Sequence, residues 1–152
     1  MKIYKTSTFI LCLILSACQA KPKYLYEGHQ RPREEAAIVS VIGLYPERKL
    51  SLTVKRIDGQ GVSRASEVHL NPGSHKFEIH LLHDAVKTES GTTIKTLETT
   101  IDHIVEVGHT YIPQATINGN RASVFFLDKG ENYPEKCNPL LLWQSQNDSV
   151  IC

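Results

Sequence analysis

Two kinds of side chain in this sequence, imidazoles and thiols, could do metal or redox chemistry. The chain has seven histidines and four cysteines among its 152 residues. Neutral imidazole is the commonest metal ligand in proteins. One hypothesis is therefore a periplasmic carrier of a metal or small ligand that uses surface histidines, namely His69, His75, His80 or His109.

The spacing of the histidines opposes a shared metal site. Residues three apart on a strand point to opposite faces, so His80 and His83 cannot both reach one ion. If residues 71–74 form a hairpin turn, His69 and His75 also diverge. No spacing matches a zinc or copper signature. We expect no metal site and no cofactor.

Motifs that carry catalysis are missing from the sequence as well. It contains no G-x-S-x-G elbow, no H-E-x-x-H and no glycine loop that would cradle a phosphate. Cys137 lies in "PEKCNPL", between two prolines, in a polar loop that suits a disulfide better than a nucleophile. The sequence therefore predicts a protein that is not an enzyme.

The thiol of Cys18 has a different chemistry, which its surroundings indicate. Lys2 and Lys5 precede an apolar run over residues 9–15, and two small residues separate that run from Cys18. This is the layout of a secretory signal peptide. A membrane-spanning helix needs about 20 apolar residues, so the run is too short to be a permanent span.

Leu15-Ser16-Ala17-Cys18 resembles the lipobox of bacterial lipoproteins. The resemblance implies cleavage of residues 1–17 and acylation of Cys18. Two acyl chains anchor a protein stably where one is marginal, so the expected partner is a membrane, bound through acyl chains on Cys18. Gln19 stands where an Asp commonly retains such proteins at the inner membrane. By analogy we expect an outer-membrane protein that faces the periplasm.

Cys137 and Cys152 are the two thiols that remain after cleavage and acylation. In an oxidising compartment we expect them to form a disulfide. The loop of about 15 residues that it closes would contribute ~3 kcal/mol in the chain-entropy model. The alternative is two free or intermolecular thiols.

The rest of the chain divides by composition. Residues 18–35 mix charges with prolines and a glycine, and we interpret them as the lipidated cysteine and a linker. Residues 36–133 contain short β-rich runs separated by turns, and residues 134–152 form a C-terminal tail. The expected strands cover residues 36–42, 50–57, 67–70, 75–82, 92–107, 109–117 and 121–127. Residues 83–91 are expected to form a polar loop.

Two features of these strands predict local structure, namely a bulge or bend in one strand and the register of a hairpin. The segment 92–107 is longer than a usual strand, so we expect a bulge or bend within it. Asn118-Gly119 is a strong signal for a two-residue hairpin turn, which would pair Tyr111 with Phe126 and keep one face apolar.

Seven short strands without helical periodicity indicate an all-β fold, an antiparallel β-sandwich of the immunoglobulin-like or transthyretin-like kind. The segments "IDGQG", "VHLNPGSHKFEI" and "VEVGHTYIP" are similar to the turn-and-strand pattern of PEGA-type sandwich modules and of small bacterial lipoproteins. That resemblance implies a fold and a place in the cell envelope, and it brings no catalytic residues.

The charge balance gives no sign of a nucleic-acid partner, because the chain has 17 basic and 16 acidic residues. The basic residues form no cluster longer than the pair Lys55-Arg56. The function that we expect is a lipid-anchored, non-enzymatic interaction or structural module. Its partner would be an envelope protein or peptidoglycan, bound through a sheet edge or through the loops at residues 60–66 and 84–91. The carrier hypothesis is the alternative.

Overall fold

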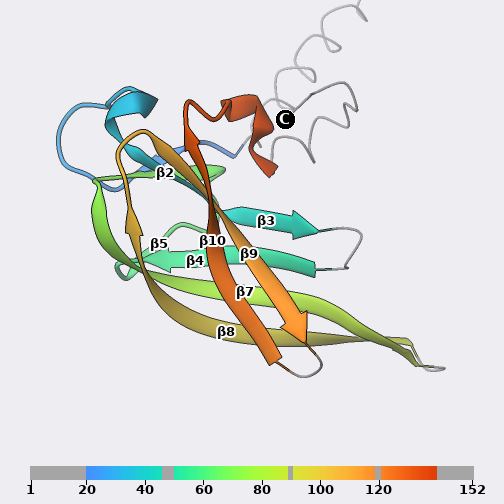
Figure 1. Cartoon of the computed structure of the whole chain (residues 1–152). Coiled ribbons are helices and arrows are strands. Elements are labelled where there is room, and N and C mark those ends of the chain that lie inside the picture. The colour runs from blue at the N-terminus through green and yellow to red at the C-terminus, as the bar shows by residue number, and fades with distance from the viewer. Residues whose placement is uncertain (1–19, 46–49, 89–90, 119–120, 140–152) are drawn as a thin grey trace, which may run out of the picture.

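The regular secondary structure of the described residues is almost entirely β-strand (Figure 1). The computed structural model describes residues 20–45, 50–88, 91–118 and 121–139. Strands make up 64% of the structure and form two antiparallel-rich sheets, which confirms the predicted all-β sandwich. Within the described residues there is no helix with the length and apolar character that crossing a bilayer requires.

The described residues contain ten strands, three more than predicted, because two short strands and a divided one were not foreseen. The first sheet contains, in spatial order, β1 (Lys23–Tyr24), β6 (Glu67–Leu70), β2 (Ala37–Ser40), β9 (His109–Asn118) and β10 (Arg121–Glu131). The second contains β3 (Ile42–Tyr45), β4 (Leu50–Ile57), β7 (Gly73–Thr88) and β8 (Gly91–Val105), with β5 (Gln60–Gly61) paired to β4. The described part of the chain also contains two single-turn 3-10 helices, η1 (Arg33–Glu35) and η3 (Glu135–Cys137).

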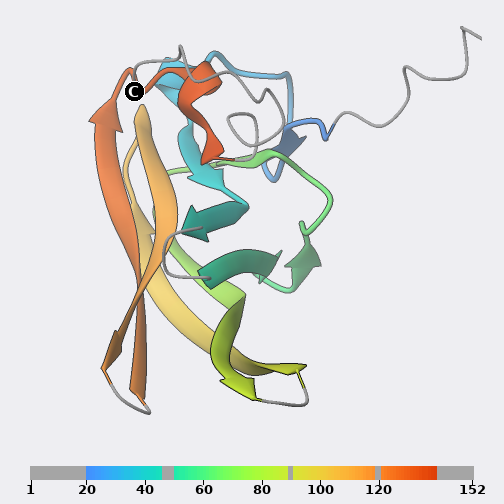
Figure 2. The ribbon, with the colours of Figure 1, turned by 90° about the vertical axis from the view of Figure 1, so that its right-hand side faces the viewer.

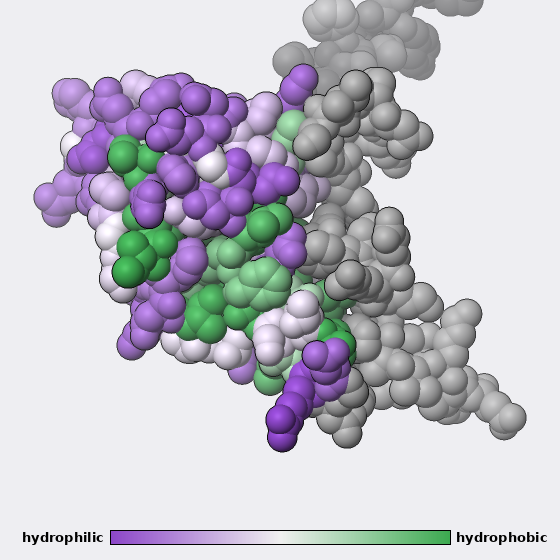
Figure 3. Space-filling view, viewed as in Figure 1, coloured by the Kyte–Doolittle hydropathy of each residue, from purple (hydrophilic) through white to green (hydrophobic). Residues whose placement is uncertain are grey.

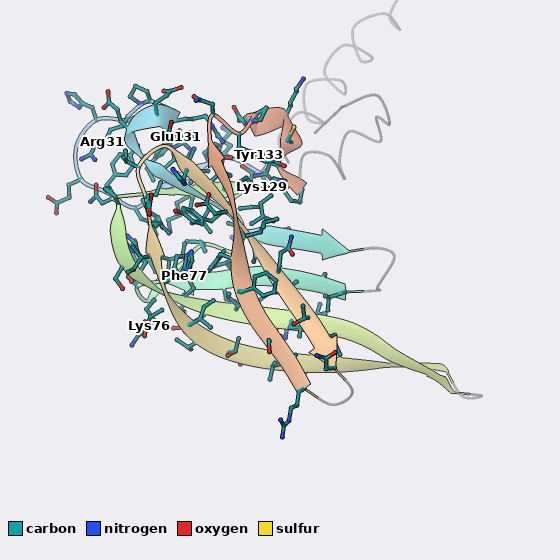
Figure 4. The ribbon with its side chains drawn as sticks, viewed as in Figure 1. Arg31, Lys76, Phe77, Lys129, Glu131 and Tyr133 are labelled. Atoms are coloured by element: carbon teal, nitrogen blue, oxygen red, sulfur yellow. The ribbon has the colours of Figure 1, made fainter. Side chains whose placement is uncertain are left out.

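Alternation of apolar residues places the core between the two sheets. Leu50, Leu52 and Val54 of β4 are buried, as their spacing predicts. Phe77 of β7 is fully buried (Figure 4), and its ring centroid lies 4.7 Å from that of Phe126 on β10. Such aromatic contacts join the sheets across the core.

The connection at residues 71–74 crosses between sheets, so the predicted hairpin there is wrong. β6 pairs with β1 and β2, whereas β7 pairs with β4 and β8. The reason lies in β6, whose four residues are all buried. A strand that is buried on both faces lies inside a sheet, and β2 and β1 occupy its two edges.

The β9–β10 hairpin has a different register from the one predicted. Asn118 pairs with Arg121, so residues 119 and 120 connect the strands, and Tyr111 pairs with Asp128 rather than Phe126. A shift of two residues leaves every side chain on its predicted face, because the strand period is two. The hairpin therefore keeps its apolar inner face.

The predicted loop at residues 83–91 is also wrong, since β7 continues to Thr88 and β8 begins at Gly91. Polar sequence does not prevent pairing, because antiparallel strands can expose a face to water. The ladder shifts between Asp84 and Val86. The bulge expected in residues 92–107 thus lies opposite that segment, on β7.

Much of the expected linker packs against the first sheet. β1 pairs in parallel with β6, and the Leu25 amide donates to the His69 carbonyl at 2.9 Å. The Ser66 amide donates to the Lys21 carbonyl at 3.2 Å. These bonds satisfy the outer edge of β6, which would otherwise expose unpaired backbone groups. The sheet therefore begins before Ala36.

Candidate functional site

The predicted lipidation site, Cys18, lies outside the described residues, and so does Cys152. Cys137, at the end of η3, is buried and disulfide-bonded, and the cysteine to which it is bonded lies outside the described residues. The Tyr133 hydroxyl donates to the Cys137 carbonyl at 3.0 Å, and Lys129 Nζ lies 5.1 Å from the Tyr133 ring centroid (Figure 4). The pairing of Cys137 with Cys152 stays a prediction.

The edge of the first sheet at β10 is the best candidate for an interaction surface. Among the described residues β10 pairs only with β9. Phe126 points into the core, whereas its neighbours Phe125 and Leu127 are 41% and 37% exposed. Apolar residues gather over the middle of β9 and β10 in the space-filling view (Figure 3).

The features that usually prevent association at an edge strand are concentrated at the C-terminal end of β10. In natural proteins, charges, prolines or bulges in an edge strand prevent it from pairing with another chain. The ladder is interrupted between Asp128 and Glu131, where Gly130 has φ +73° and Lys129 adds a charge. Residues 121–127 are paired without interruption and carry one charged residue, Arg121. This stretch has an uninterrupted backbone edge beside two exposed apolar side chains.

His69 is the first of the four candidate histidines, and it is buried in a polar network on the outer face of the first sheet. His69 Nε2 donates to Glu67 Oε1 at 2.8 Å, and Arg33 also bonds that carboxylate. Asn138 Nδ2 donates to the Ser66 carbonyl at 3.2 Å. Glu67 and His69 are only 2% and 4% exposed. The N-terminal and C-terminal segments therefore cover this face and meet at Glu67.

The electrostatics of the network favour the ionised form of Glu67 over the protonated form. Burial acts to raise the pKa of Glu67, but the hydrogen bond from His69 and the positive charge of Arg33 outweigh it. Together they hold the pKa of that carboxyl below its ordinary value. His69 Nδ1 is buried without a partner in the described part of the chain. Sequence reasoning missed this network, although a glutamate inside the short strand Glu67–Leu70 is the signal that could have found it.

His75 lies in a separate cluster at the turn between β4 and β5. Asp58 and Gly59 both have positive φ, 50° and 78°, as a type I′ turn requires. His75 Nδ1 lies 2.6 Å from Asp58 Oδ2, and the Lys76 amide donates to Asp58 Oδ1 at 2.9 Å. His75 Nε2 donates to the Asn71 carbonyl at 2.8 Å. Both ring nitrogens are thus engaged in holding the turn.

His80 and His109 occupy two further places. His80 pairs with Glu98 across β7 and β8. His109 Nδ1 lies 2.9 Å from Asp128 Oδ2, and this hydrogen bond raises the pKa of His109. The structure does not bring the four histidines together. Within the ranges that it describes, no three side chains of histidine, cysteine, aspartate or glutamate are grouped to hold a metal ion.

Comparisons with known proteins found no relative of this chain. The chain matches no protein-family model, no curated protein and no solved structure.

Proposed function

We propose that this protein is a lipid-anchored component of the bacterial cell envelope whose β-sandwich is a non-enzymatic interaction module. The acylated residue is Cys18, and the place is the outer membrane, facing the periplasm. The resemblance of Leu15-Ser16-Ala17-Cys18 to a lipobox supports the anchor, and Gln19 after the cysteine supports the outer membrane.

The observation that carries the interaction role is the edge of β10, which has no second strand paired to it among the described residues. A strand from a partner can pair with such an edge through backbone hydrogen bonds, while its side chains contact Phe125 and Leu127. The partner that fits is an extended segment of an envelope protein with apolar residues at alternate positions. Peptidoglycan fits less well, because a glycan offers no strand to pair with.

Crosslinking in intact cells tests the interaction role. A photo-reactive amino acid at Leu127 should give an adduct with one envelope protein. The same group at Ile104, which is apolar and 67% exposed, should not. Phe125→Lys should reduce the Leu127 adduct about fivefold or more, because loss of an apolar anchor at an interface costs above ~1 kcal/mol. Equal labelling at both positions, or an adduct unaffected by Phe125→Lys, would contradict this role.

Fractionation tests the anchor independently. Cys18→Ser should fail to incorporate labelled palmitate and should move from the membrane fraction to the soluble periplasmic fraction. If the variant still sedimented with membranes, something other than acylation would hold the protein there.

A further inference from the structure

The folded domain begins very close to the proposed acylation site. The first described backbone bond to the sheet is made by the Lys21 carbonyl, which accepts from the Ser66 amide. Lys23 and Tyr24 then pair with Val68 and His69. Consecutive Cα atoms are 3.8 Å apart, so Cys18 lies at most about 11 Å from Lys21. A tether this short restricts how the domain can face a membrane.

The part of the domain beside this tether is formed by two segments that are distant in sequence. Lys23 Nζ donates to the Gly61 carbonyl at 2.7 Å, which joins residues 20–24 to residues 60–66. We call these two segments the β1–β5 surface. Figure 2 shows β1 and β5 on one side of the sandwich and β10 on the other. β1 and β10 are the two outer strands of the first sheet, four strand spacings or roughly 19 Å apart.

The charges of the β1–β5 surface complement a lipid surface. Its two segments contain three basic residues, Lys21, Lys23 and Arg64, and no acidic residue. Basic residues next to a bilayer are attracted to anionic headgroups. Tyr24, which is half-buried in β1, belongs to a residue type that is enriched at membrane interfaces.

We infer that the β1–β5 surface lies against anionic lipid headgroups, with the β10 edge turned toward the aqueous side. This inference rests on the proposed acylation of Cys18. In this orientation the two edges of the first sheet, β1 and β10, have different roles. One edge is held at the membrane by a short tether, and the other is free to bind a partner.

Fluorescence quenching in vesicles tests the orientation. The acylated full-length protein is placed in vesicles of phosphatidylglycerol and phosphatidylethanolamine that contain lipids with spin-labelled headgroups. A fluorophore is attached through Ser63→Cys in the β1–β5 surface or, as the matched control, through Ser123→Cys on β10. Both serines are exposed, and neither is near Cys18 in the sequence. Quenching should be at least about twofold stronger at position 63, because the two edges lie roughly 19 Å apart. Equal quenching, or stronger quenching at position 123, would overturn the inference.

A second variant tests the tether itself. A spacer of about ten glycines and serines between Gln19 and Ala20 adds a flexible reach of roughly 17 Å. Quenching at position 63 should then fall to the level of position 123 while the protein still sediments with vesicles. Unchanged quenching would overturn the tether argument. Mass spectrometry of each sample shows whether Cys18 is acylated, and so distinguishes a failure of the anchor from a failure of the orientation. An unacylated protein would overturn the anchor and this inference together, whereas an acylated protein without the difference between positions 63 and 123 would overturn this inference alone.

Discussion

Glu67 and His69 occupy alternate positions on β6, and their side chains meet on the same face, with His69 Nε2 2.8 Å from Glu67 Oε1. This face points away from the core between the sheets, yet both residues are almost fully buried. Arg33 from the N-terminal side completes the charge pair, and Asn138 from the C-terminal side bonds the neighbouring Ser66 carbonyl. The network thus connects the start and the end of the described domain.

Removal of the Glu67 charge should destabilise the protein strongly. Glu67→Gln leaves the half-buried Arg33 without its charged partner, and the loss of such a charged hydrogen bond costs about 2 kcal/mol. Urea unfolding measures the change. Glu78→Gln is the matched control, since the Arg56–Glu78 pair is 3.2 Å long but exposed and should contribute less than ~1 kcal/mol. Equal losses in the free energy of unfolding for the two substitutions would show that burial of the Glu67 network does not add to the stability of the protein.

The same carboxylate should make stability depend on pH. The pKa of Glu67 in the folded state lies below its ordinary value of 4.5. Its stabilising contribution is therefore complete above that value and is lost as pH falls toward the lower folded-state pKa. The free energy of unfolding should decline below about pH 4.5, and the decline should be shallower in Glu67→Gln. Parallel pH profiles for the two proteins would refute this role of Glu67.

The pKa values of two histidines should be shifted in opposite directions from the ordinary value of 6.5. The hydrogen bond to Asp128 raises the pKa of His109, whereas burial lowers the pKa of His103. Imidazole NMR signals followed against pH should give a midpoint above 6.5 for His109 and below 6.5 for His103. Asp128→Asn should lower the His109 midpoint. The reverse order of the two midpoints would contradict the geometry around Asp128.

The disulfide of Cys137 should pair it with Cys152. Digestion without reduction should release one peptide pair that contains both cysteines, and Cys152→Ser should destabilise the domain by ~3 kcal/mol. Cys12→Ser is the control, because the proposed cleavage removes Cys12. A peptide that joins Cys137 to any other cysteine would disprove the pairing.

Local chemistry predicted the elements that depend on neighbouring residues. The strands at Leu50–Ile57 and Glu67–Leu70 have the expected bounds, and Asp58-Gly59 turns as its residue types require. Alternation also gave the correct inner face of the β9–β10 hairpin, because that face depends only on the strand period.

Features that depend on distant partners were not predictable. The turn at residues 71–74 looks the same whether it closes a hairpin or crosses between sheets, and the choice depends on β2 and β8. Lys23 and Tyr24 gain their strand conformation only by pairing with β6. The burial of Glu67 likewise depends on Arg33 and Asn138, which are 34 and 71 residues away in sequence.

The central claim is that a lipid on Cys18 holds this β-sandwich at a membrane. Mass spectrometry of the N-terminus of the native protein tests it most directly. The account predicts a chain that begins at Cys18 and carries the added mass of a diacylglyceryl group on that cysteine. An uncleaved start, or an unmodified cysteine at the mature N-terminus, would contradict it.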